Sequence, residues 1–295
     1  REDRAAAAVV QDNKDFAESV GHRGHDTLAY PYMLAKLHKL DTHRDPYRPI
    51  VGKSKKNTPT GNPYPRGGVT SLTDVARHVD KMAQSALDLL MLGDRKNKIK
   101  RFWVIRTPQE FIDVVSACPN IRTQSIKDFT QMYTNLPHDD LIEGCTNAFE
   151  LIVPEIARRF NLEAADARNR LRFTDDGKWT LDASKGWSIA DFINAMTYVV
   201  KNNYIKVGDK VFRQVKGIGM GVECSPSLAN LFLHWKEREY VEKKITELGE
   251  AEVMRRYHGF RHHCRFIDDL YAPIPKADMP TDADYGGLPG PPGRG

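Results

Sequence analysis

The stretch Cys264-Arg265-Phe266-Ile267-Asp268-Asp269-Leu270-Tyr271-Ala272 sets two adjacent carboxylates between two short runs of strand-forming residues. The pattern predicts a strand, a turn at the acidic pair and a second strand within residues 263–274. Aspartate is a favoured turn residue, so the pair by itself is compatible with a purely structural hairpin. Adjacent acids between apolar strands are costly unless a positive charge offsets them, and a bound cation is the natural offset.

A third carboxylate, Asp128, stands near the end of another short predicted strand at residues 125–129, just ahead of a predicted helix. Mg²⁺ binds a few carboxylate oxygens, keeps waters and takes its remaining ligands from substrate phosphates. Two such ions about 3.5–4 Å apart can activate a hydroxyl and stabilise a departing pyrophosphate. We therefore expect Asp128, Asp268 and Asp269 to be catalytic ligands of two Mg²⁺ ions, with Mn²⁺ as a substitute, in a phosphoryl-transfer reaction.

The rest of the chain carries regular helix and strand signals. Apolar periodicity, capping residues and prolines predict helices at residues 71–93, 107–117, 137–160, 188–202 and 225–248, and Pro154 indicates a bend within the third. Short runs of β-formers predict a strand at 102–105 and a hairpin at 204–214. Composition describes the other segments: a helical 1–20, a basic loop or hairpin at 46–68, an irregular 164–185, and a disordered Pro- and Gly-rich tail at 277–295.

Composition indicates an ordinary globular protein, because 40% of the 295 residues are hydrophobic and 28% are charged. The net charge of +5 permits a polyanionic partner without requiring one. Four cysteines without paired spacing favour a reducing compartment over a disulfide scaffold. Since no run of about eighteen apolar residues occurs, we expect a soluble, intracellular protein that does not enter a membrane. A start without methionine suggests that the chain begins inside a larger reading frame or a processed product.

Four blocks of sequence follow one another between Tyr32 and Pro275, so they cover most of the chain. In order, the blocks are Ala35-Lys36-Leu37-His38-Lys39 with Arg48-Pro49-Ile50-Val51; Asp128-Phe129-Thr130-Gln131-Met132-Tyr133-Thr134-Asn135-Leu136-Pro137-His138; Gln214-Val215-Lys216-Gly217-Ile218-Gly219-Met220-Gly221 with Ser225-Pro226 and Ala229-Asn230-Leu231; and Phe266-Ile267-Asp268-Asp269. Together these blocks resemble the motifs of reverse transcriptases, most closely those of Penelope-like retroelements, which are relatives of the telomerase catalytic subunit.

The resemblance implies an α/β (α+β) right-hand polymerase fold, with an antiparallel palm sheet packed on helices. It places fingers elements in residues 1–120, the catalytic palm in 121–276 and the tail in 277–295. The implied activity is that of an RNA-directed DNA polymerase, a nucleotidyltransferase that adds dNMP to a primer 3′-hydroxyl, with an RNA template, a DNA primer and dNTPs as partners. Family members continue into a helical thumb and many add a GIY-YIG nuclease, so we expect both to be missing here and processive synthesis to be weak.

The resemblance also assigns roles to individual residues. It implies that Arg48 and Lys39 neutralise the triphosphate of the incoming nucleotide, since an arginine fork suits phosphate. It places the Tyr133 ring under the sugar, where it would clash with a 2′-hydroxyl. Gln214 would contact the nucleotide. A loop that approaches template and primer would contain Gly217, Met220, Gly221, Ser225 and Pro226.

Other interpretations remain open for several of these features. Tyr133 could be a core aromatic, the lysines could be solvated charges, and the basic stretch 48–66 could either follow a nucleic-acid backbone or simply face solvent. The cluster around His262 and His263 suggests zinc, but adjacent residues of a strand point to opposite sides. The alternative functions are a catalytically inactive nucleic-acid-binding remnant of a retroelement, and a telomerase-type or RNA-dependent RNA polymerase.

Overall fold

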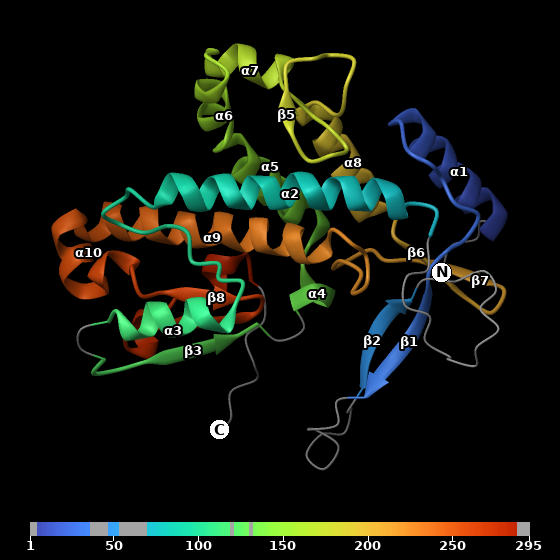
Figure 1. Cartoon of the computed structure of the whole chain (residues 1–295). Coiled ribbons are helices and arrows are strands. Elements are labelled where there is room, and N and C mark those ends of the chain that lie inside the picture. Colours follow the sequence, from blue (N-terminus) through green and yellow to red (C-terminus); the bar gives the residue numbers. More distant parts are fainter. Residues whose placement is uncertain (1–4, 36–46, 53–69, 119–120, 130–131, 288–295) are drawn as a thin grey trace. The chain divides into compact units, whose positions relative to one another are not determined.

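A computed structural model of the chain describes residues 5–35, 47–52, 70–118, 121–129 and 132–287 (Figure 1). The chain forms two compact units, and each is discontinuous in sequence. The first unit combines Arg1–Met82 with Arg172–Ser225, and the second combines Ala83–Leu171 with Pro226–Gly295. These units interleave along the chain, whereas the sequence suggested consecutive segments divided at residues 120 and 276. The assignment of fingers and palm to those segments stays a prediction.

The expected fold class, helices combined with antiparallel sheet, is confirmed. Ten α-helices are described, and the named strands pair antiparallel in one three-stranded sheet and three two-stranded ones. Four predicted elements occur close to their expected bounds, because each has a strong local start signal. They are the helices α2 (Thr73–Asp94), α8 (Ile189–Lys201) and α9 (Ser225–Leu248), and the hairpin of β6 (Tyr204–Val207) with β7 (Lys210–Arg213).

The first unit packs a helix on a hairpin. Val9 of α1 (Ala6–Ser19) is buried with Tyr204 and Val211 of the β6–β7 hairpin. Ala29 forms a parallel bridge with Ile205, which joins the segment after α1 to the same hairpin. Two further antiparallel pairs belong to this unit: β1 (Tyr30–Ala35) with β2 (Tyr47–Gly52), and β4 (Arg172–Phe173) with β5 (Trp179–Thr180).

The second unit contains a three-stranded antiparallel sheet in the order β3-β9-β8. Its strands are β3 (Ser125–Asp128), β8 (Cys264–Phe266) and β9 (Asp269–Ala272). The helix α3 (Pro108–Ser116) lies beside this sheet in Figure 1, and the rings of Phe111 and Tyr271 meet edge to face 5.3 Å apart. The unit also contains residues 226–248 of α9, residues 83–94 of α2, and the helices α4 (Met132–Asn135), α5 (His138–Glu150), α6 (Val153–Arg159), α7 (Ala164–Arg170) and α10 (Glu250–Tyr257).

The helix expected at 137–160 with a bend at Pro154 is wrong as one continuous helix, because the structure divides it close to that proline into α5 and α6. Pro154 lies in the first turn of α6, where its missing N–H costs nothing, and it could not have continued α5. The irregular segment expected at 164–185 is also wrong. It contains α7 and the β4–β5 pair, which form because Ala167, Leu171 and Phe173 are buried.

Two further expectations need correction. Residues 102–105 do not form a strand: Val104 makes a single parallel bridge to Arg265, and α3 follows at Pro108 with Thr107 as its N-cap. The part of the tail up to residue 287 is ordered rather than disordered. It contains the 3₁₀-helices Lys276–Asp278 and Ala283–Tyr285, and the Tyr285 ring is buried against Phe129 with centroids 4.6 Å apart.

The start of α8 provides a stability prediction. The Ser188 hydroxyl accepts a hydrogen bond from the Asp191 amide at 3.1 Å, and the Asp191 carboxylate accepts one from the Ser188 amide at 2.8 Å, which is a complete capping box. We expect Ser188→Ala to lower the free energy of unfolding by about 1 kcal/mol, and Ser188→Gly to lower it by only a few tenths. Urea denaturation measures both. Equal losses for the two variants would contradict this role of the hydroxyl.

Candidate active site

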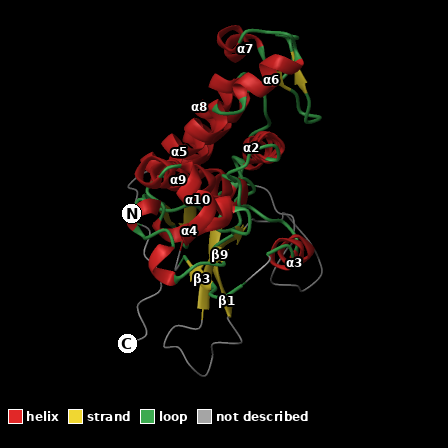
Figure 2. Cartoon of the chain, turned by 90° about the vertical axis from the view of Figure 1, so that its left-hand side faces the viewer, coloured by secondary structure: helices red, strands yellow, loops and turns green. Residues whose placement is uncertain are grey.

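Three aspartates meet at one end of the sheet in the second unit. Asp128 at the end of β3 lies directly opposite Asp269 at the start of β9, and the Phe129 amide donates to the Asp268 carbonyl at 3.1 Å. Directly opposed residues of an antiparallel pair project on the same face, with Cβ atoms about 4.5–5.5 Å apart. Figure 2 shows β3 and β9 side by side. Asp128 and Asp269, which are 141 positions apart in sequence, are therefore neighbours in this sheet.

The three carboxylates interact electrostatically. The pKa of Asp269 is raised, first by burial and then by the charges of Asp268 and Asp128. Asp128 and Asp269 are exposed and Asp268 is partly exposed, so a cation can reach them from solvent. Carboxylate oxygens are the donors that Mg²⁺ prefers, and the mutual repulsion of the three groups is what a divalent cation would relieve. The donor set therefore fits the expected Mg²⁺ ions.

The turn that carries Asp268 has a strained backbone. β8 and β9 are joined by the two residues Ile267 and Asp268, and Ile267 has φ of 55°. A left-handed conformation is unfavourable for a β-branched residue and persists only where the surroundings hold it. One hydrogen bond restrains this residue: the Arg265 guanidinium donates from Nη1 to the Ile267 carbonyl at 2.8 Å.

Arg265 is itself fixed by a buried polar network on α9. Its guanidinium forms an ion pair with Glu237, and both side chains are fully buried. It also donates to the Asn230 side-chain oxygen at 2.7 Å. Asn230 and Glu237 are seven residues apart on α9 and so face the same side of that helix. The network connects the backbone of α9 to the turn that bears Asp268.

Sequence reasoning did not assign roles to Arg265 and Glu237. The available signal was a cation in an otherwise apolar strand, which demands a buried partner. The partner could not be named from sequence, since it lies 28 residues away on a helix that also carries several other charges.

Tyr133 lies on α4, in the same unit as the aspartates, and its side chain is half-buried. This helix begins four residues after Asp128, and it is anchored by the fully buried neighbours Met132 and Leu136. A half-buried ring differs from a residue of the packed core, because part of its surface remains open to a ligand. The predicted contact with a nucleotide sugar stays a prediction.

The predicted template and primer loop belongs to the first unit up to Ser225. The Gln214 side-chain oxygen accepts from Asn203 at 2.6 Å, and the Gln214 amide donates to the Lys216 carbonyl at 3.0 Å. Gly217 and Gly221 have φ of 79° and 111°, a conformation that favours glycine.

The end of this loop is fixed at the start of α9. The Ser225 hydroxyl donates to the Gly219 carbonyl at 2.8 Å, and Ser225 is buried. Met220 bridges to Val222, and Pro226 occupies the first turn of α9. These contacts define the shape of the loop.

Of the two basic residues predicted to bind phosphate, Arg48 lies within the described part of the chain and Lys39 does not. Arg48 lies on β2, where its backbone is opposite Leu34 of β1. Lys39 lies outside the described residues, as do Thr130 and Gln131 of the motif that begins at Asp128. The roles of Arg48 and Lys39 stay predictions.

Among the described residues, one group of His, Cys, Asp and Glu side chains has three ligand atoms all within 4.8 Å of one another, and it consists of His22, His78 and Asp175. The three aspartates of the sheet, which are all described, do not form a group this tight. The cluster at His258–Cys264 that suggested zinc contains a His263 ring packed against Trp103 and Phe260, with centroid distances of 5.0 and 4.9 Å.

None of the helices in the described part of the chain is long and apolar enough to cross a membrane.

Comparison with known proteins gives structural neighbours only. No protein-family model matches the sequence, and no curated protein matches it. The chain is similar to a structure of apo telomerase from Candida tropicalis truncated from the C-terminal domain, with a TM-score of 0.48, 13% identity, and coverage of 83% of this chain and 43% of that one.

Two structures of telomerase in complex with a TWJ fragment of telomeric RNA are also similar. The Candida tropicalis complex has a TM-score of 0.47, 13% identity and coverage of 88% and 38% of the two chains. The Candida albicans complex has a TM-score of 0.47, 12% identity and coverage of 83% and 37%. The chain thus spans about two fifths of the length of these telomerase chains.

Proposed function

We propose that the chain is the catalytic part of a reverse transcriptase, an RNA-directed DNA polymerase of the kind found in Penelope-like retroelements. The observation that supports this proposal best is the pairing of Asp128 with Asp269 across β3 and β9, beside Asp268 in the adjoining turn. Acids from two distant sequence motifs thereby share one end of a sheet, where the motif resemblance expects a two-metal site. The predicted substrates are dNTPs, a DNA primer and an RNA template.

Different residues of the chain would have different roles in this reaction. Asp128 and Asp268 would hold the metal ions, and Asp269 would orient one ion or its waters. When bound, the Mg²⁺ ions would increase the nucleophilicity of the primer 3′-hydroxyl and neutralise charge on the departing pyrophosphate. The Arg265 contact keeps the strained turn, and therefore the Asp268 backbone, in one position.

The loop with Gly217 and Gly221 would let nucleic-acid backbone approach closely, since a residue without a side chain leaves that space open. Arg48 and Lys39 would neutralise the triphosphate. These roles extend the motif resemblance residue by residue, and each can be tested by substitution.

A direct test is addition of a single dTMP to an oligo(dT) primer on poly(rA), with protein in excess over primer–template. Excess protein removes the need for processive synthesis, which a thumb would support. We expect incorporation that depends on Mg²⁺ or Mn²⁺ and is abolished by a chelator. Binding of the primer–template without any incorporation under either metal would instead support an inactive nucleic-acid-binding remnant.

Tyr133 provides a second prediction, on nucleotide selection. If its ring lies under the sugar, it excludes a 2′-hydroxyl sterically, and a steric difference of one small group changes kcat/KM by about 10–200-fold. We expect Tyr133→Ala to lower the dTTP-to-UTP ratio of kcat/KM by about tenfold or more. The matched control is Tyr133→Phe, which keeps the ring and should keep the ratio. Unchanged selectivity in Tyr133→Ala would rule out this role.

A further inference from the structure

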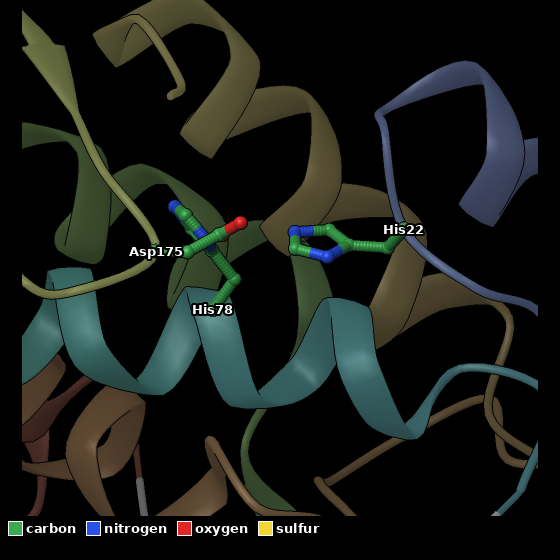
Figure 3. A group of neighbouring side chains, drawn as sticks. All are labelled: His22, His78 and Asp175. Carbon is green, nitrogen blue, oxygen red and sulfur yellow. The ribbon is translucent and has the colours of Figure 1, made fainter. Parts of the chain in front are cut away.

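Two histidines and an aspartate from three separate segments converge in the first unit, and none of them has a role in the function proposed above. His22 lies just after α1, His78 lies on α2, and Asp175 lies in the connection between β4 and β5. Figure 3 shows the three side chains turned toward one another. One ligand atom of each lies within 4.8 Å of the others.

The contacts within the group are those of a nearly assembled metal site. The His78 Nδ1 atom lies 2.7 Å from the Asp175 carboxylate, and the His22 and His78 ring centroids are 5.0 Å apart. In a zinc site with bonds of about 2.0–2.2 Å to nitrogen and oxygen, neighbouring ligand atoms are separated by about 3.3 Å. The His78–Asp175 contact is therefore a hydrogen bond that an ion would replace, and Asp175, with 78% of its side chain accessible, can move to the wider separation.

The two imidazoles have nitrogen atoms without a hydrogen-bond partner. The Nε2 atom of His22 is buried and unpartnered, whereas on His78, which is 3% exposed, Nδ1 faces Asp175 and the buried, unpartnered Nε2 points away from that carboxylate. A buried polar atom without a partner is unfavourable and calls for an explanation, of which an ion is one. Burial also lowers the pKa of both histidines, which favours the neutral imidazole that binds metals.

The surroundings hold the histidines in place. The Trp187 ring lies 4.1 Å from the His78 ring and 5.0 Å from the His22 ring, and its indole N–H donates to the Val20 carbonyl at 2.8 Å. Lys81 Nζ donates to the backbone carbonyl of Asp175 at 2.5 Å. The carboxylate of Asp175 contacts His78 instead. The two histidine side chains are therefore already oriented, and the exposed Asp175 is free to adjust.

We propose that His22, His78 and Asp175 bind one divalent transition-metal ion of the zinc class. Two imidazoles and one carboxylate suit zinc and similar ions, whereas Mg²⁺ prefers an all-oxygen donor set. The ion would connect the segment after α1, the helix α2 and the β4–β5 connection, and would leave a coordination position open to water on the exposed side of Asp175. This site is independent of the proposed polymerase site and its magnesium ions.

Zinc chloride titrated into the chelator-treated full chain in excess Mg²⁺ tests the proposal, by calorimetry and by thermal unfolding. We expect one zinc ion per chain and a rise in Tm of about 5 °C or more at zinc concentrations far above Kd. Co²⁺ as a substitute should give a visible absorption band from nitrogen and oxygen ligands.

The test uses His22→Gln and Asp175→Asn rather than a change at His78. His78 is buried, so replacing it could prevent the chain from folding. Loss of an outer-shell partner of a metal ligand costs about 10–100-fold in affinity, so loss of a ligand itself is expected to weaken zinc binding by about 10-fold or more. The matched controls are His25→Gln and Asp176→Asn, which change the neighbouring histidine and the neighbouring exposed aspartate and should bind zinc as wild type does. No zinc binding by the wild-type chain, or wild-type binding by both His22→Gln and Asp175→Asn, would overturn the proposal.

Discussion

Replacing Asp268 with asparagine is expected to reduce nucleotide addition by about 1,000-fold or more while the chain stays folded. A metal ion supplies several kcal/mol of charge stabilisation in the transition state, and each 1.36 kcal/mol corresponds to a factor of ten in rate. Asparagine keeps the size of the side chain and removes the charge that holds the ion. The measurement is single-nucleotide addition on poly(rA) at saturating Mg²⁺, with the same assay for Asp128→Asn.

In Asp268→Asn, we expect thermal stability to be unchanged or increased although activity falls. The pKa of Asp269 is raised in the folded chain by burial and by its two acidic neighbours, so ionising it costs free energy in the absence of metal. That cost is absent at a pH below the ordinary aspartate value of 3.8, and it develops as the pH rises through the raised pKa. At neutral pH without metal, we therefore expect the Tm of Asp268→Asn to equal or exceed that of wild type, with the difference vanishing in acid.

The matched control for this experiment is Asp166→Asn, which removes an exposed aspartate from the first turn of α7 in the same unit. It should leave nucleotide addition unchanged. Wild-type rates in both Asp268→Asn and Asp128→Asn would refute the assignment of these residues as metal ligands. A low rate accompanied by a large fall in Tm would indicate misfolding instead, and the Tm measurement makes the two outcomes distinguishable.

Glu237→Ala should destabilise the second unit strongly, by about 3–5 kcal/mol, because it leaves the fully buried Arg265 guanidinium without its ionic partner. Arg265 also holds the Ile267 carbonyl, so loss of the pair should loosen the turn that carries Asp268. We expect nucleotide addition to fall under conditions where the variant is still folded. Urea denaturation monitored by circular dichroism gives the stability, and the extension assay gives the activity.

Two comparisons isolate the buried pair. Glu239→Ala removes an exposed carboxylate that pairs with Lys236 on the same helix, and should change stability by less than about 1 kcal/mol. The double replacement of Glu237 and Arg265 by methionine removes both charges and should be less destabilising than Glu237→Ala alone. A single variant as stable as the Glu239→Ala control would show that the network contributes little.

Much of the local structure could be predicted from the sequence because its signals are local. The Ser188 cap, the Gly208-Asp209 turn and the Ser225-Pro226 start each act within a few residues, and the corresponding elements are present. Two of the errors, the segment 164–185 and the tail, arose where burial decided the outcome. Tyr285 orders a Pro- and Gly-rich tail by packing on Phe129, which no local pattern in residues 277–295 indicates.

The candidate site likewise combines features that are local in the sequence with contacts that only the tertiary structure sets. The sequence by itself determined that Asp128 and the Asp268-Asp269 pair stand at strand ends, since alternation of residue types shows where a strand begins and ends. Only the tertiary structure decided that Asp128 faces Asp269, that Glu237 neutralises Arg265, and that His22 and His78 meet Asp175. Such contacts join residues from 28 to 153 positions apart. They form when the chain closes on itself to bury apolar surface, and the spacing of residue types along the chain does not encode which partners that burial brings together.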